Sequence, residues 1–181
     1  VTPDNDAPVM VTHTGMTLEE GGQVVLTWHM LEARDVEQTS AQVNFILATA
    51  PSHGVMSVNG RVVTTGGSFT QEDIDHHRVV YTHDGGESIS DPFVVTVTDG
   101  VGGVLLNQSV AVTVTAVNDA PRLLTHAGLT VAEGGSQPLS PAILSVTDAE
   151  SGPEAVLYRL ASIPVHGGLY RDGVVLGVGQ T

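Results

Sequence analysis

An internal repeat is the feature that most constrains the fold of this 181-residue chain. A gap-free shift of 113 residues superimposes 5–68 on 118–181, and 24 of the 64 aligned pairs are identical. Both copies open on the same four residues, Asn-Asp-Ala-Pro. Because self-similarity at a fixed period indicates that one structural unit is used again, we expect tandem modules of one architecture.

The second copy stops before the repeat is complete. Thr181 aligns with Ser68, so the second copy has no counterpart of 69–116. We therefore expect a complete repeat at 1–117, followed at 118–181 by the amino-terminal part of another. A repeat without its last strands leaves a sheet edge and an apolar face uncovered. This half is expected either to contact a partner or to be more loosely packed.

Within the complete copy, apolar residues recur at every second position, which is typical of half-buried strands. Turn-forming residues, many of them glycines, separate these segments. About a hundred residues of short strands per copy indicate an all-β fold, with a β-sandwich in each repeat and the second sandwich incomplete. The pattern predicts strands at 43–48, 55–58, 79–82, 93–98 and 110–115.

Two short motifs add local detail to the strand pattern. Asn-Gly at 59–60, repeated as Asp-Gly at 172–173, predicts a tight hairpin in each copy because these residues tolerate positive φ. A single helical turn is predicted at 70–75. Thr70 is its expected N-cap, and Asp73 stands three residues further on, as in a capping box.

The charge of the chain excludes several classes of partner. Asp and Glu number 20 against 6 basic residues, all arginine, and the net charge is -14. Such a surface repels nucleic-acid phosphates and anionic membranes. No apolar run approaches the roughly 18 residues that span a bilayer. We therefore expect no nucleic-acid partner and no membrane insertion of this segment.

The residue types also argue against catalysis. Cysteine is absent, so disulfides and thiolate metal sites are excluded. No Gly-x-Ser-x-Gly elbow and no phosphate loop ending in Gly-Lys-Ser or Gly-Lys-Thr occurs. His53 recurs as His166 and His13 as His126, so these side chains are interpreted as part of the architecture. The chain is not expected to be an enzyme.

A series of motifs follows in order along the complete copy: Asn-Asp-Ala-Pro, Glu-Gly-Gly, Pro-x-His-Gly, Phe69–Ile74, Tyr81–Gly85, Asp91–Phe93 and Val97–Gly100. Taken together, these motifs resemble those of the CSPG repeat, which occurs in the NG2 proteoglycan, the Fras and Frem matrix proteins and large bacterial surface proteins. The resemblance implies cadherin-like, immunoglobulin-like sandwiches strung end to end in an extracellular or cell-surface protein of adhesion or matrix. It implies neighbouring repeats as partners, with another surface protein, matrix protein or glycan beyond them.

The Asn-Asp-Ala-Pro segment resembles the linker at which cadherins hold calcium, a cation that prefers carboxylate and carbonyl oxygens. The resemblance implies one site at the repeat junction and an equivalent site at the outer end. Ala116 replaces the linker aspartate usual in cadherins, and Asp-x-Glu replaces Asp-x-Asp. Alternatively, the same residues only form turns and keep the surface soluble. The expected junction ligands are Glu20, Asp84, Glu87, Asn118, Asp119, Asp148 and Glu150, and the outer ones are Asn5, Asp6, Asp35, Glu37 and Asp99.

Two functions thus compete. The first is a non-catalytic adhesion or matrix segment that calcium makes rigid at the repeat junctions. The second is a module that recognises a protein or glycan on a sandwich face without any ion, for which Trp28, replaced by Pro141 in the second copy, is a candidate contact. Arginine without lysine, with abundant Gly, Ala and Val, indicates a high-GC genome and hence a bacterial source.

Overall fold

The structure is a computed structural model and describes residues 4–181. Its contacts divide the chain into unit 1, Val1–Val117, and unit 2, Asn118–Thr181. Unit 1 contains β1 (Val9–His13), β2 (Met16–Glu19), β3 (Gln23–Val25), β4 (Leu31–Arg34), β5 (Asn44–Thr49), β6 (Gly54–Val58), β7 (Arg61–Val63), β8 (Ser68–Thr70), α1 (Gln71–Asp75), β9 (Val79–His83), β10 (Phe93–Thr98), β11 (Val104–Val110) and β12 (Val112–Thr115).

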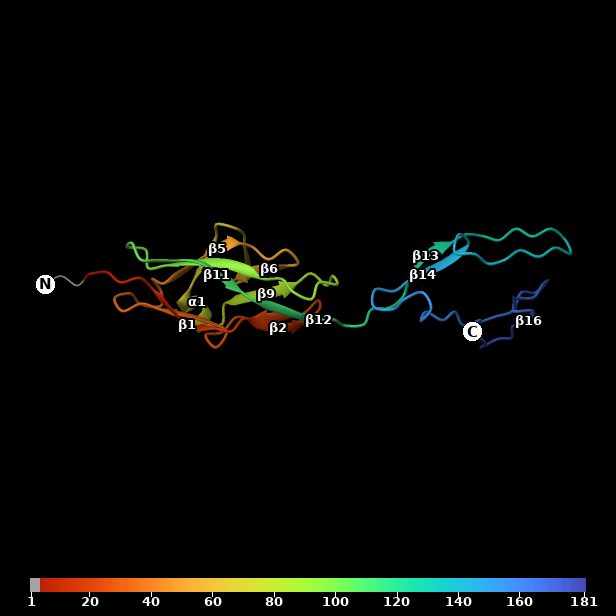
Figure 1. Cartoon of the computed structure of the whole chain (residues 1–181), viewed down its shortest axis with the longest axis horizontal. Coiled ribbons are helices and arrows are strands. Elements are labelled where there is room, and N and C mark those ends of the chain that lie inside the picture. Colours follow the sequence, from red (N-terminus) through yellow and green to blue (C-terminus); the bar gives the residue numbers. More distant parts are fainter. Residues whose placement is uncertain (1–3) are drawn as a thin grey trace. The chain divides into compact units, whose positions relative to one another are not determined.

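Unit 1 is built from two four-stranded antiparallel sheets (Figure 1). One has the order β11-β10-β5-β8 and the other β3-β9-β6-β7. The strand pair β1–β4 is antiparallel, whereas β2 runs parallel to β12. Strands from the start and the end of the repeat are therefore hydrogen-bonded to each other, and the β-sandwich predicted from the alternation is confirmed.

The core lies between the sheets. Alternate residues of β9 and β10 are buried, with Tyr81, Phe93 and Val95 fully inaccessible. The rings of Phe45 and Phe69 stack at 5.3 Å between centroids. With few aromatic residues available, valine and leucine supply most of the remaining core, and their burial drives the association of the sheets.

The predicted hairpin and helix are both confirmed. β6 and β7 are joined by Asn59 and Gly60 at φ 48° and 77°, the left-handed values that a two-residue turn of this kind requires. In α1 the Thr70 hydroxyl accepts from Asp73 N, and the Asp73 carboxylate accepts from Thr70 N, which completes the capping box.

One strand prediction was wrong in its extent. The alternating segment 110–115 is two strands in different sheets, because β11 ends at Val110 and β12 begins at Val112. Between them, Ala111 O accepts a 2.9 Å hydrogen bond from Met16 N. The chain changes its pairing partner there from β10 to β2, and an alternation of side chains carries no signal for such a change.

Unit 2 repeats the first part of this topology with β13 (Arg122–His126), β14 (Leu144–Thr147), β15 (Tyr170–Arg171) and β16 (Val174–Val175). Arg122 pairs with Thr147, the positions that correspond to Val9 and Arg34, and both pairs of strands carry an irregularity two residues later. The β15–β16 hairpin turns at Asp172-Gly173 with φ of 52° and 80°, as predicted. The duplication is therefore visible in strand register.

Other segments of unit 2 are not strands. The counterparts of β2, β3 and β5, at 129–132, 136–138 and 157–162, have irregular backbone, and no residue described in unit 2 is buried. In unit 1 these strands pair with β12, β9 and β10, whose counterparts unit 2 does not contain. An unpaired strand lacks half of its ladder, so the looser packing expected for this half is found. Within 4–181, no helix is long and apolar enough to cross a membrane.

Candidate cation sites at the ends of the repeat

The five outer residues of the predicted calcium set converge at one end of unit 1. Asn5 Nδ2 donates a 2.6 Å hydrogen bond to Asp99 Oδ2, and Asp6 N donates to Glu37 Oε2 at 3.4 Å. Glu37 N in turn donates to Asp35 Oδ1 at 2.9 Å. Hydrogen bonds that involve these five residues thus join three segments that are distant in sequence.

Asp35 also binds a residue that the sequence interpretation missed. Gln38 N donates to Asp35 Oδ1 at 3.0 Å, and Gln38 Nε2 points at Asn5 Oδ1 at 3.5 Å. Asp35 Oδ2 and Gln38 Oε1 are buried and accept no hydrogen bond from the described residues. Both atoms are oxygen acceptors, and a buried acceptor without a donor is unfavourable by about 1–3 kcal/mol. Water or a hard cation would satisfy them.

Asp99 has a different environment from the other four. Its Oδ1 accepts from the backbone N–H of Val101, Gly102 and Gly103 at 2.8–3.0 Å, and its Oδ2 accepts from Asn5 and Gly103. The Asn5 hydrogen bond, followed by these backbone bonds, holds the pKa of Asp99 below its ordinary value against the opposing effect of burial. Asp99 therefore orders the 99–103 turn and has little remaining capacity for a cation.

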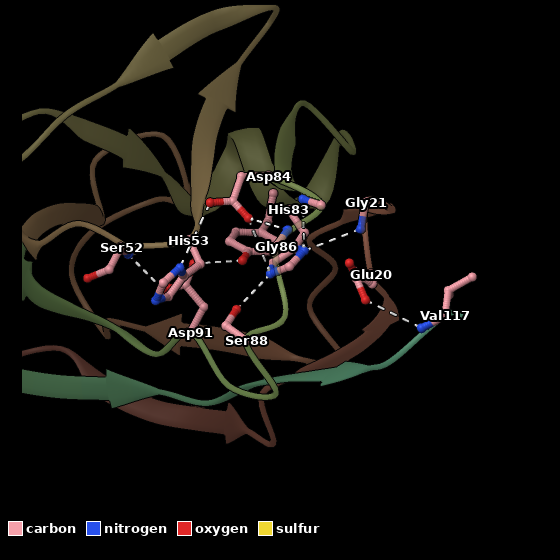
Figure 2. Close-up of polar contacts among 12 residues, drawn as sticks. Glu20, Gly21, Ser52, His53, His83, Asp84, Gly86, Ser88, Asp91 and Val117 are labelled. Carbon is pink, nitrogen blue, oxygen red and sulfur yellow. Dashed lines mark hydrogen bonds and ion pairs between the residues drawn. The ribbon is translucent and has the colours of Figure 1, made fainter. Parts of the chain in front are cut away.

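The opposite end of unit 1 holds the predicted residues Glu20 and Asp84 (Figure 2), and Glu87 lies beside Glu20. Glu20 Oε2 accepts from Val117 N at 3.4 Å, and a carboxylate oxygen of Glu20 lies within 4.8 Å of one of Glu87. Asp84 instead accepts from Gly86 N at 2.9 Å and lies 3.8 Å from His53 Nδ1. Glu20 and Glu87 are thus close together, whereas Asp84 is turned toward His53.

His83 joins the two loops that carry these acids. Its Nδ1 accepts from Gly21 N and Gly85 N, each at 3.2 Å, and its Nε2 lies 2.8 Å from Ser88 Oγ (Figure 2). Nδ1 thus faces two backbone N–H groups, and Nε2 faces the Ser88 hydroxyl. This histidine, 3% exposed, is a structural element of the loops and not a metal ligand in this arrangement.

Unit 2 reproduces the hydrogen bonds of the outer end. Asn118 Nδ2 donates to Asp119 O at 2.7 Å, as Asn5 does to Asp6 O at 3.1 Å. Asp119 N donates to Glu150 Oε2 at 3.2 Å, and Asp148 Oδ1 accepts from Ser151 N at 2.9 Å. Three hydrogen bonds of the outer end thus recur in the second copy. The predicted junction set combines these four residues of unit 2 with Glu20, Asp84 and Glu87 of unit 1.

In the sequence, only the local pattern of its loop could have identified Gln38. Its counterpart in the second copy is Ser151, which keeps the backbone bond to the aspartate but has no amide oxygen. Duplication, the strongest sequence signal, therefore did not identify it. The remaining signal is its place three residues after Asp35, where a backbone N–H commonly turns back to an aspartate.

Comparison with known proteins gives a family match over most of the chain. The matching family model is described as cadherin-like and covers residues 8–116 and 121–177. FRAS1-related extracellular matrix protein 2 of Homo sapiens is 30% identical over 178 residues, which are 95% of this chain and 6% of that protein. Chondroitin sulfate proteoglycan 4 of Mus musculus is 34% identical over 118 residues, 61% of this chain and 5% of that protein.

Extracellular matrix organizing protein FRAS1 of Mus musculus is 29% identical over 186 residues, 92% of this chain and 5% of that protein. These matrix relatives place the chain outside the cell. They are animal proteins and do not support the bacterial source suggested by composition. Since the family model matches residues 8–116 and 121–177, the chain belongs to the cadherin-like family.

Proposed function

We propose that this chain is a non-catalytic segment of an extracellular matrix or adhesion protein, and that calcium bound at the ends of its repeats makes the segment rigid. The observation that carries the calcium part is the pair of buried acceptors, Asp35 Oδ2 and Gln38 Oε1, which have no donor among the described residues. Both oxygens belong to a network that also contains Asn5 and Glu37.

The chemistry of this network suits calcium better than other common metals. Calcium takes about six to eight oxygen ligands from carboxylates, amides and backbone, in irregular geometry. Neither cysteine nor histidine belongs to the network, so zinc and copper are disfavoured. Asp35, Glu37, Gln38, Asn5 and Asp6 would hold the ion, while Asp99 would orient Asn5 through the 2.6 Å hydrogen bond.

We extend the proposal to the second copy, where part of this network recurs through Asn118, Asp119, Asp148 and Glu150. A bound cation would tie the segment that precedes each repeat to the Asp-x-Glu loop within it. It would also remove part of the repulsion within a chain of net charge -14. A stiff array of repeats is a property that a matrix or adhesion protein can use.

Calorimetric titration of the full chain with calcium, together with thermal unfolding in calcium and in chelator, tests this proposal. We expect binding and a higher melting temperature in calcium, since an ion that binds only the folded state adds about 2.7 kcal/mol at a hundred times its Kd. Asp35→Asn should reduce both effects. Asp172→Asn removes the same charge from the β15–β16 turn and should reduce neither.

Identical melting in calcium and in chelator, with no heat of binding, would contradict the proposal. A response that Asp35→Asn leaves unchanged would place the ion elsewhere and remove the assignment to this network.

A further inference from the structure

A polar pocket lies in unit 1 beside the only tryptophan of the chain. Its volume is about 500 Å³, within the range of about 300–1,000 Å³ that is usual for small-molecule sites. The residues that matter for its chemistry are Trp28, Glu32, Arg34, Gln71 and Asp75, and Asp35 and Gln38 of the cation network line it as well.

The polar groups of the pocket are fixed by one another. Arg34 Nε donates to Glu32 Oε1 at 2.6 Å on β4. Across the pocket, Gln71 of α1 accepts from Ala33 N through Oε1 and donates from Nε2 to Asp75 Oδ1, both at 2.9 Å. Glu32 and Gln71 are 7% and 3% exposed, so α1 and β4 hold these planar groups before any ligand arrives.

The Arg34 guanidinium and the Asp75 carboxylate can each form further hydrogen bonds to a ligand. The Arg34 side chain is 71% exposed, and only its Nε is engaged. Asp75 is exposed and uses Oδ1 alone. Trp28 is 45% exposed, with one ring contact, to His29 at 3.4 Å between centroids. The pocket thus combines hydrogen-bond donors, acceptors and an aromatic surface.

This combination matches a neutral polyhydroxylated ring. Hydroxyl groups donate and accept, so they can bond both to a guanidinium and to a carboxylate. Glu32 is paired with Arg34, and Asp35 belongs to the cation network, so Asp75 is the acid that remains for a ligand of this pocket. A sulfated or carboxylated sugar would be repelled by Asp75 and by a chain of net charge -14.

The pocket is not part of the architecture that the two copies share. At the shift of 113 residues, Trp28 becomes Pro141, Glu32 becomes Ser145 and Arg34 becomes Thr147. Of the cation network, Asn5, Asp6, Asp35 and Glu37 recur, whereas Gln38 becomes Ser151. We propose that this pocket binds a neutral sugar residue, with the pyranose ring on Trp28 and its hydroxyls bonded to Arg34 and Asp75. The sugar proposal does not rest on the proposed calcium function, although the pocket borders Asp35 and Gln38 of the cation network.

Trp28 provides the measurement, since all tryptophan emission of the chain comes from this site. The full chain is titrated with glucose, galactose, mannose, N-acetylglucosamine and N-acetylgalactosamine, in calcium and in chelator. We expect at least one to change the emission saturably with a millimolar Kd in both buffers. A heparin oligosaccharide and N-acetylarginine amide, as anionic and cationic probes, should give no saturable change.

Variants locate the binding. Arg34→Ala and Asp75→Ala should each weaken the sugar by about 10-fold, or about 1.4 kcal/mol. Arg61→Ala on β7 and Glu19→Ala on β2 make the same charge changes at exposed positions outside the pocket and should have no effect. Circular dichroism confirms that all four variants are folded.

Several results would overturn the proposal. These are the absence of a saturable response to every neutral sugar, saturation by a charged probe alone, and unchanged affinity in both pocket variants. A response that needs calcium would also contradict it, while loss of calcium binding with the sugar response intact would bear only on the proposed function.

Discussion

The phenol hydroxyl of Tyr81 donates a 2.7 Å hydrogen bond to Asp91 Oδ2, and both residues are buried. The other oxygen, Asp91 Oδ1, accepts from Ser52 N at 2.6 Å (Figure 2). Tyr81 lies on β9, and Asp91 stands two residues before β10 begins. The pair therefore links the two sheets of unit 1 at the end that carries Glu20 and Asp84.

Replacing Tyr81 by phenylalanine should destabilise unit 1. The change keeps the ring in the core and leaves Asp91 Oδ2 without its donor, which costs about 1–3 kcal/mol. Chemical denaturation measures the loss. Tyr170→Phe, at a tyrosine that is 67% exposed, is the matched control and should leave stability unchanged. Equal stability of the Tyr81 variant and the wild type would show that this bond contributes nothing.

The same tyrosine predicts a loss of stability at alkaline pH. Burial, together with the hydrogen bond to Asp91 and its charge, raises the pKa of Tyr81 well above its ordinary value. Its contribution is fully present below about pH 10, the unfolded pKa, and is lost as pH rises toward the folded pKa. The stability difference between wild type and Tyr81→Phe should narrow above about pH 10. A constant difference would contradict this linkage.

Asp99 predicts the opposite dependence, at acidic pH. Because hydrogen bonds lower the pKa of Asp99, its contribution is present above the unfolded value of about 3.9 and is lost as pH falls through the folded pKa. Asp99→Asn should melt at a lower temperature than wild type at neutral pH, and the gap should close in acid. Asp172→Asn should show no such gap at either pH.

Close packing against Tyr81 explains why position 54 is a glycine. A Cβ atom at this position would lie within 2.6 Å of the Tyr81 ring, so Gly54→Ala forces the ring or the strand to move. Overpacking of this kind costs about 1–3 kcal/mol. Gly128→Ala in unit 2 meets nothing within 4 Å and is the control. If Gly54→Ala melts like wild type, the Pro-x-His-Gly motif needs another explanation.

The features of the fold that could be predicted from the sequence are those with a local signal. Alternation located β9 and β10, and backbone preference located the turns at Asn59 and Asp172. These features depend on residues that are neighbours in the chain. The change of partner at Ala111 depends instead on Met16, 95 positions earlier, and no short-range pattern contains it.

The residues of the candidate sites divide in the same way, into those that the sequence signals and those that only the structure reveals. Duplication drew attention to Asp35 and Glu37, because their counterparts stand at the same positions of the second copy. Gln38 and the pocket beside Trp28 occur in one copy only, so repetition could not reveal them. They became visible only when β4, α1 and the intervening loop were placed together.

The parallel pairing of β2 with β12 has a mechanical consequence. These strands lie near the start and the end of unit 1, and their ladder is continued by bonds from Met16 N to Ala111 O and from Glu20 N to Thr115 O. Tension between the two ends pulls parallel strands along their length in opposite directions. It therefore loads all of these bonds together in shear, and not one after another as in the peeling of a hairpin. A repeat closed in this way resists stretching best along the direction in which an array of repeats is pulled.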